Sequence, residues 1–431
     1  MGLGLRALGR LAGSELVDRV GARKPAERAL YRATREGFRA AGASARTFKA
    51  AQQRKEPARL KPAADRGLFD LTPSDEQQMI QESFRAFAAE RLRPAALAAD
   101  GACAAPAELL EQVGELGLTM LGVPEELGGA VSERSTLTAV LATEALAHGD
   151  MGLALAALAP ASVASALSLW GDVEQQATYL PALVGEDIPA AALALHEPRA
   201  LFDPRKPATT ARRDGADYVL DGAKSLVPLA ERASLLILGA QIEGRGPGLF
   251  LLETGSAGML VKPTPGMGVR AAGSGELRLK DVRVPAGALL ADGDPVVYAE
   301  CVRRARLGWC ALAVGTAQAV LDYVIPYVND RVAFGEPISH RQAVAFAVSD
   351  IAIELEGMRL ATLRAASRAD SGRTFAAEVA LARSLCAQKG ARIGSEGVQL
   401  LGGHGYVTEH PVERWYRDLQ AVGVYEGALL V

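Results

Sequence analysis

The chain has 431 residues, of which 49% are apolar, 23% charged and 5% aromatic. This composition is typical of a globular protein long enough for two or three domains, and it excludes collagen-like, disulfide-scaffold and wholly disordered chains. Lysine and arginine number 47 against 50 acidic residues, so the formal net charge is −3.

The charge is unevenly distributed. Residues 1–66 hold 16 basic and 6 acidic residues, a net charge of +10, whereas residues 67–431 carry a net charge of −13. Nucleic-acid enzymes are normally basic over their folded domains too, so we expect no nucleic-acid partner. Within this basic head, a leucine-rich helical stripe is flanked by arginines. Two interpretations stay open: an amphipathic helix on an anionic membrane surface, or a helical hairpin packed on the body.

The stretch 54–62, which has two prolines and five charges, predicts a linker between this head and the rest of the chain. The longest uncharged run, Met151–Gly171, consists mostly of alanine and other small residues. We expect it to form a buried helix rather than a membrane span.

The cysteines indicate neither a metal site nor a disulfide framework. They lie far apart, without the spacing of zinc ligands, at Cys103, Cys301, Cys310 and Cys386. This pattern fits a reducing cytoplasm. The basic head would add a peripheral contact with the inner face of the membrane if it binds lipid.

The first third of the body is helical in pattern. Thr72–Asp75 offers an N-cap followed by acidic residues, which is typical of a helix start. Helical periodicity then covers Glu76–Leu92, Ala107–Leu116, Ser135–His148 and Trp170–Val184.

From about residue 188 the period changes to that of strands. Asp214-Gly215 and Asp221-Gly222 are hairpin-type turn signals, and several short strands follow one another without intervening helices. This arrangement favours an antiparallel barrel or sandwich. The segment Gly266–Ala271 formally fits a dinucleotide-binding fingerprint, but it lacks the strand and helix that such a fingerprint requires.

The chain becomes helical again from about residue 295. The predicted helices cover Val296–Val324, Ser339–Ala369 and Phe375–Leu401. We therefore divide the chain into a basic extension (1–66), an N-terminal α domain (67–187), a β domain (188–294) and a C-terminal helical domain (295–431).

Four motifs in the last third stand out. They are R-V-A-F-G from Arg331 followed by Gln342, Q-L-L-G-G-H-G-Y from Gln399, P-V-E-R-W-Y-R-D from Pro411, and Y-E-G from Tyr425. Three glycines in four residues let backbone N–H groups approach a phosphate, although such a run is also typical of a helix C-cap. With these motifs, in this order, the sequence resembles the acyl-CoA dehydrogenase family over about residues 69–431.

The resemblance implies an α+β multi-domain fold with an N-terminal helical domain, a central antiparallel β-barrel and a C-terminal four-helix bundle. It also implies FAD-dependent dehydrogenation of an acyl-CoA thioester. Glu426 matches the family's catalytic base, and apolar neighbours such as Val424 would raise its pKa toward the working range. An alternative base position of the family is Ala305 here. Arg306, Tyr425 and Gly427 match residues at the thioester end of the substrate.

By the same resemblance, the FAD pyrophosphate and adenine would contact Arg331, Phe334 and Gln342 of one subunit. Gln399, Gly402 and Gly403 would come from its neighbour, so a homodimer or homotetramer is expected. The family passes its electrons to an electron-transfer flavoprotein.

The segments that hold the flavin ring depart from the family pattern. His196 replaces a hydroxyl that faces the flavin, and Phe202 replaces a phosphate-binding serine. Leu226 and Pro228 replace a tryptophan and a threonine. His196 could substitute for the missing hydroxyl. A poorly active paralogue that binds acyl-CoA or a partner, and a flavin oxidase or monooxygenase of the same fold, are the competing hypotheses.

Overall fold

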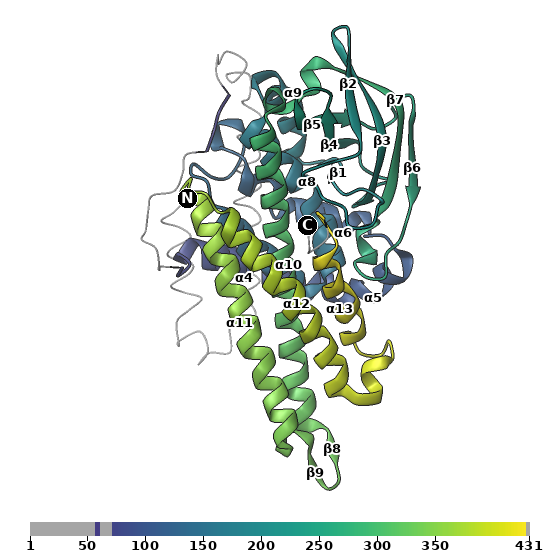
Figure 1. The fold of residues 1–431 in the computed structure, drawn as a ribbon. Coiled ribbons are helices and arrows are strands. Elements are labelled where there is room, and N and C mark those ends of the chain that lie inside the picture. The colour runs from purple at the N-terminus through teal and green to yellow at the C-terminus, as the bar shows by residue number, and fades with distance from the viewer. Residues whose placement is uncertain (1–56, 61–70, 428–431) are drawn as a thin grey trace.

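The computed structural model describes residues 57–60 and 71–427 of the chain (Figure 1). The described part consists of an N-terminal helical domain, a curved β-sheet and a C-terminal helical domain, which confirms the predicted order of α, β and α segments. The amphipathic helix expected in the basic head lies outside the described residues.

The N-terminal domain is built around the helix α8. It comprises α4 (Asp75–Phe87), which continues through the π-helical turn η2 (Ala88–Leu92), α5 (Arg93–Ala102), α6 (Ala107–Glu115), α7 (Thr136–Gly149), α8 (Met151–Trp170) and α9 (Val173–Leu183). The predicted helix start is confirmed, since Ser74 and Gln77 form a capping box. The helix expected over 170–184 begins later than predicted, because Asp172 forms a capping box of its own.

The helices α8 and α10 (Pro295–Asp330) are each long and apolar enough to cross a membrane, judged by length and composition. Both are mostly buried inside the protein. They are therefore core helices, as we expected for the run that begins at Met151.

The β domain is a curved sheet. Its strands are β1 (Ala191–Ala194), β2 (Thr210–Asp214), β3 (Asp217–Val227), β4 (Leu235–Ile242), β5 (Gly246–Glu253), β6 (Met259–Pro263) and β7 (Gly275–Pro285). They follow the order β1-β4-β2-β3-β7-β6, with β5 paired to β4. Neither the expected closure nor a purely antiparallel pattern is present among the described residues: β1 and β2 run parallel to β4, and β5 and β6 each have one partner.

The fingerprint-like segment Gly266–Ala271 is a loop that leads into a short 3₁₀ turn. A Cβ atom on Gly268 would lie 2.3 Å from the Arg417 backbone oxygen, so this glycine is needed for close packing against the C-terminal domain.

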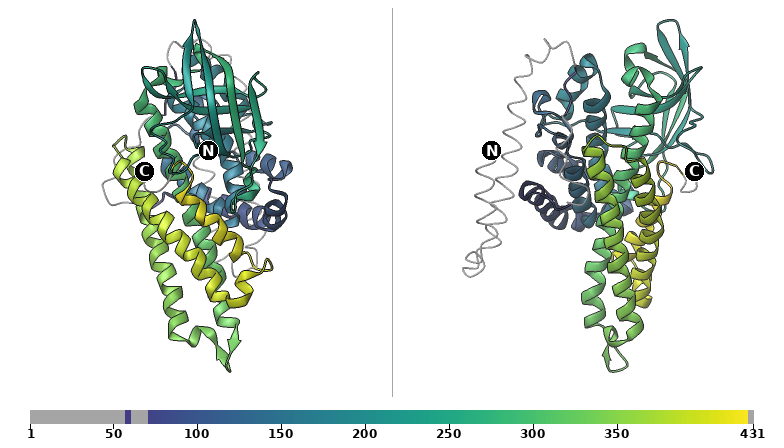
Figure 2. Two further views of the ribbon diagram at one scale, coloured as in Figure 1. Left: turned by 45° about the vertical axis from the view of Figure 1, so that its right-hand side comes forward. Right: turned by 60° about the vertical axis from the view of Figure 1, so that its left-hand side comes forward.

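The C-terminal domain is a helical bundle whose axis is α10. Beside it lie α11 (Gln342–Asp370), α12 (Ala376–Leu401) and α13 (Val412–Leu419). The 36 residues of α10 rise about 54 Å, from the sheet to a small hairpin of β8 (Val332–Ala333) and β9 (Glu336–Pro337) (Figure 1). The views in Figure 2 show the bundle extending away from both other domains.

The described part of the predicted linker is packed onto the N-terminal domain. The side chains of Ala58 and Leu60 are buried. Arg59 Nη2 donates to the backbone oxygen of Gly171 at 2.6 Å, and Gln176 Nε2 donates to that of Ala58 at 3.2 Å. This segment is therefore a fixed contact rather than a free linker.

Candidate active site

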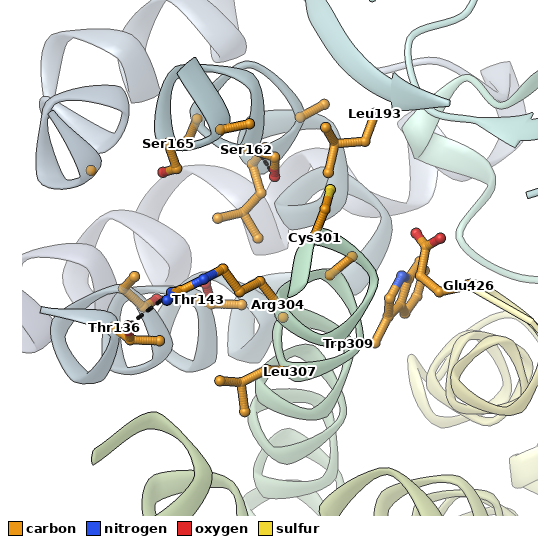
Figure 3. Close-up of a pocket in the computed structure, with 18 of the residues that line it drawn as sticks. Thr136, Thr143, Ser162, Ser165, Leu193, Cys301, Arg304, Leu307, Trp309 and Glu426 are labelled. Atoms are coloured by element: carbon orange, nitrogen blue, oxygen red, sulfur yellow. Dashed lines mark hydrogen bonds between the residues drawn. The ribbon is translucent and has the colours of Figure 1, made fainter. Parts of the chain in front are cut away.

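A mostly apolar cavity of about 240 Å³ lies between the N-terminal domain, the sheet and α10 (Figure 3). Helices α7, α8 and α10 supply most of its lining, and the rest comes from β1, the end of β3, the turn at 118–122, Leu60 and the C-terminal segment. Glu426 enters it from the C-terminal segment. Figure 3 shows this carboxylate beside Trp309, across the cavity from Ser162 and Ser165.

The backbone around Glu426 is held by two arginines. Arg306 Nε and Nη2 donate to the Glu426 backbone oxygen at 3.0 and 2.8 Å. Arg383 Nη2 donates to the backbone oxygens of Tyr425 and Gly427 at 2.6 and 2.5 Å. Glu426 itself has a φ of 56°, which is costly for a residue other than glycine and persists where neighbouring contacts impose it.

The surroundings of Glu426 raise the pKa of its carboxyl above that of an ordinary glutamate. Burial raises the pKa of its carboxyl, and the nearby charges of Arg383 and Arg306 offset part of this effect. Its Oε2 atom has no hydrogen-bond partner among the described residues. This Oε2 atom is therefore available to accept a proton from a molecule in the cavity.

The residues on either side of Glu426 are fixed. The Tyr425 ring packs on Trp309 with a centroid distance of 4.2 Å, and Tyr425 Oη lies 3.1 Å from Ser274 Oγ. Gly427 has a φ of 101°, and a Cβ there would lie 2.5 Å from Pro204. The Y-E-G motif is thus a rigid turn that projects the carboxylate of Glu426.

His196 lies in the same cavity, immediately after β1. Burial lowers the pKa of its imidazole to about 4, helped by the positive charge of Lys224, so the ring is neutral near pH 7. Its Nδ1 atom has no partner among the described residues. Phe202 is buried and meets the His196 ring edge-on at 5.1 Å, so it packs the histidine in place where a phosphate-binding serine would otherwise stand.

Lys224 and Glu197 form a buried ion pair near His196, which the sequence analysis did not predict. Lys224 Nζ lies 2.8 Å from Glu197 Oε1, and both side chains are almost completely buried. Glu197 also accepts hydrogen bonds from the backbone N–H groups of Ala208 and Thr209 at 2.7 and 2.9 Å. A lysine within an apolar strand was the signal that could have indicated this pair, since buried lysines are rarely unpaired.

The cavity wall near His196 has the chemistry that a planar ring requires. Leu226 and Pro228 give the cavity an apolar wall, and the unpartnered nitrogen of His196 offers a hydrogen bond at its edge. A neutral imidazole can donate from one nitrogen and accept at the other. These residues therefore suit a flavin ring, although they differ from those that the family usually provides.

A second group of predicted cofactor residues lies at the far end of the bundle. Arg331, Phe334, Gln399, Gly402 and Gly403 line one hollow of a single chain. We expected an FAD to meet these residues from two subunits; within one chain they lie around the same hollow. Gln342 is not among the lining residues.

This phosphate-side group is distant from the Glu426 cavity. The 25 positions of α10 between Arg306 and Arg331 correspond to about 37 Å along the helix. A dinucleotide that contacted both groups of the same chain would have to span about this distance.

Comparison with known proteins agrees with the motifs. The three domain models of acyl-CoA dehydrogenases match the chain: the N-terminal domain over 74–187, the middle domain over 192–282 and the C-terminal domain over 295–429. Helical domain, curved sheet and helical bundle are the fold of this class of oxidoreductases, which act on CH–CH groups. The chain belongs to the acyl-CoA dehydrogenase family.

Individual relatives are similar over most of their length. The human mitochondrial short-chain specific acyl-CoA dehydrogenase is 33% identical over 388 residues, which cover 86% of this chain and 93% of the relative. A chain solved in a study of the electron-transferring flavoprotein of Acidaminococcus fermentans has a TM-score of 0.78 at 29% identity. The match covers 84% of this chain and 97% of the solved one. A glutaryl-CoA dehydrogenase from Mycobacterium smegmatis, solved with FADH2, has a TM-score of 0.76 at 27% identity, covering 84% and 94%.

Proposed function

We propose that the protein uses FAD to convert an acyl-CoA thioester into the trans-2-enoyl-CoA, with Glu426 as the catalytic base. The observation that carries this proposal is the Glu426 carboxylate, which projects into an apolar cavity with an unpartnered oxygen and faces the same space as His196. A buried carboxylate with a raised pKa is a stronger base than an exposed one.

In this reaction the chain's own residues bind, orient and deprotonate the substrate. The thioester would lie with its α-carbon at Glu426, and the carboxylate would take the α-proton. When bound, FAD supplies the acceptor for the β-hydrogen and its electron pair. Arg306 and Arg383 hold the backbone of the base during proton transfer, while Trp309 and Leu195 keep water away from it.

The separation of the two cofactor-binding regions supports an oligomer. His196 would contact the ring of a flavin whose phosphates and adenine lie against Arg331, Gln399 and Gly402 of a second copy. The far end of the bundle offers exposed apolar surface for this purpose: Phe334 is 95% exposed and Tyr406 88%. A homodimer is the smallest assembly in which each flavin has both regions.

A further apolar stripe follows α11. Phe346, Ile353 and Leu360 recur every seven residues and are largely exposed. Seven-residue spacing places side chains on one face of a helix, as in helices that pack against a partner. This face supports a second contact between copies, and hence a dimer of dimers.

We further propose an electron-transfer flavoprotein as the electron acceptor. The similarity to a chain studied with such a flavoprotein supports this acceptor.

The replacement Glu426→Gln tests the proposal, because it keeps the side-chain shape and removes the proton acceptor. We expect flavin reduction by acyl-CoA under nitrogen to slow by about 10²–10⁴-fold with flavin content unchanged. Glu111→Gln, on the exposed surface of α6, is the matched control.

Normal reduction in Glu426→Gln would contradict the assignment of the base. Wild-type protein that contains no flavin after expression with excess riboflavin, and takes up none on refolding, would favour the non-catalytic paralogue. The replacements at Phe202, Leu226 and Pro228 are the observation behind that alternative. Peroxide formation in air would indicate an oxidase instead.

A further inference from the structure

We infer that Leu60, in the N-terminal extension, forms the end wall of the acyl cavity and limits the length of acyl chain that the enzyme accepts. This inference rests on the proposed function. It assigns the substrate class as straight-chain saturated acyl thioesters whose methyl end meets Leu60, longer than the short chains named for the human relative.

The cavity follows α8 for most of the helix. Leu155, Leu158, Ser162, Ser165 and Leu169 line it in succession, and the lining continues to Trp170. The 15 positions from Leu155 to Trp170 rise about 22 Å. A four-carbon acyl group would leave most of this length unfilled.

The two ends of α8 fix the direction of the cavity. At the start of α8, a Cβ atom on Gly152 would lie 3.2 Å from Ala271. Ser274, three residues after Ala271 in the chain, lies within hydrogen-bond distance of Tyr425 Oη. The first turn of α8 therefore lies at the Glu426 end. Trp170, the last residue of α8, lies at the opposite end of the helix. Beside it, Arg59 donates a hydrogen bond to the backbone oxygen of Gly171.

Leu60 lines the cavity at this distal end. Its side chain is 6% exposed, and it is the one described residue before position 71 that lines the cavity. Trp170, Leu121 and Gly122 line the same cavity from the body of the protein. The hydrogen bonds of Arg59 and Ala58 to the α8–α9 corner hold this short segment in place.

The path to Leu60 suits a hydrocarbon tail. Ser162 Oγ donates to the Leu158 backbone oxygen at 2.9 Å, and Thr143 Oγ1 to that of Ala139 at 2.7 Å, so both hydroxyls are satisfied internally. Arg304 Nε donates to Glu300 at 2.8 Å and its Nη1 to Thr136 at 3.3 Å, while its Nη2 has no hydrogen-bond partner among the described residues. Leucine at the end offers methyl groups and no polar atom to the substrate.

The experiment uses the full-length holoenzyme and measures anaerobic flavin reduction by butyryl-, octanoyl-, dodecanoyl- and octadecanoyl-CoA. Burial of each added methylene is worth about fourfold in kcat/KM, so activity should rise with chain length until the tail reaches Leu60. Leu60→Ala should move the optimum to longer chains. Leu60→Trp should move it to shorter chains.

Leu97→Ala, at a 55% exposed leucine of α5, should keep the wild-type profile. Coincident profiles for wild type, Leu60→Ala and Leu60→Trp would overturn the inference while leaving the proposed function intact. A preference for acyl chains with a terminal carboxylate would also overturn it, because that result would assign the cavity end to Arg304. Failure of every acyl-CoA to reduce wild-type flavin would instead refute the proposed function.

Discussion

The guanidinium of Arg306 donates two hydrogen bonds to the backbone carbonyl of Glu426. The resemblance to the family suggested a substrate contact for this arginine, and the structure shows it bound to the backbone of Glu426, the proposed base. Its charge also lowers the pKa of the Glu426 carboxyl, against the larger effect of burial. Arg306 therefore holds the backbone of Glu426 and has an electrostatic effect on its carboxyl.

Arg306→Gln should change the pH dependence of flavin reduction. Removing the positive charge raises the pKa of Glu426 further, and the base works only when it is deprotonated. The acid limb of the pH–rate profile should therefore move to higher pH, with a lower rate near neutrality. Arg212→Gln, on the exposed side of β2, is the control. An unshifted acid limb would show that Arg306 does not influence the base.

His196→Ala should release FAD more readily than the wild type, because it removes the unpartnered ring nitrogen at the edge of the cavity. His196→Thr, which restores the hydroxyl usual in the family, should retain more flavin than His196→Ala. The flavin absorbance that remains with the protein after gel filtration measures the retention of FAD in the wild type and in both variants. Since the pKa of His196 is about 4, wild-type flavin retention should not change through the titration of this ring between pH 6 and pH 8. Equal retention and identical spectra in all three proteins would remove His196 from the flavin site.

Lys224→Met should destabilise the protein strongly, because it leaves the Glu197 carboxylate buried without its partner. Removing one member of a buried ion pair typically costs about 3–5 kcal/mol. The double variant Lys224→Met/Glu197→Gln should recover part of the loss, since no buried charge then remains. Urea unfolding followed by circular dichroism compares the three proteins. A double variant no more stable than Lys224→Met would argue against the pair as the cause.

The basic head can be tested without disturbing the cavity. Residues 1–56 contain 13 basic and 5 acidic residues, whereas residues 57–60 are packed against the body. Full-length protein should sediment with anionic vesicles at low salt, and deletion of residues 2–56 should abolish this without loss of flavin. A deletion that alters the oligomeric state, with no vesicle binding by the full-length protein, would show that the head contacts a neighbouring subunit.

Features that depend on neighbouring residues were predicted well. Helical periodicity located α7 and α12 to within a few residues, the uncharged run from Met151 indicated the buried helix α8, and the Ser74 cap was recognised from a short motif. The Tyr425-Glu426-Gly427 motif likewise indicated a residue, Glu426, that lines the cavity and that we propose as the base.

Features that depend on residues far apart in the sequence were not predicted. The parallel pairing of β1 with β4 joins strands separated by about forty residues, and no local pattern specifies it. The Glu197–Lys224 pair and the contact of Leu60 with the cavity have the same character. Charge and proline content predicted a linker over 54–62, because composition does not show which side chains find a surface to pack against.

The length of α10 has a genetic consequence. If each flavin lies between the Glu426 region of one chain and the Arg331 region of another, Glu426→Gln and Arg331→Ala damage different halves of the same composite site. Each variant alone should be inactive. A hybrid dimer of the two should contain one doubly damaged site and one intact site, so co-expression of differently tagged chains should restore measurable activity. Two recessive lesions would then complement each other within a single gene, whereas chains that each built a complete site would show no such rescue.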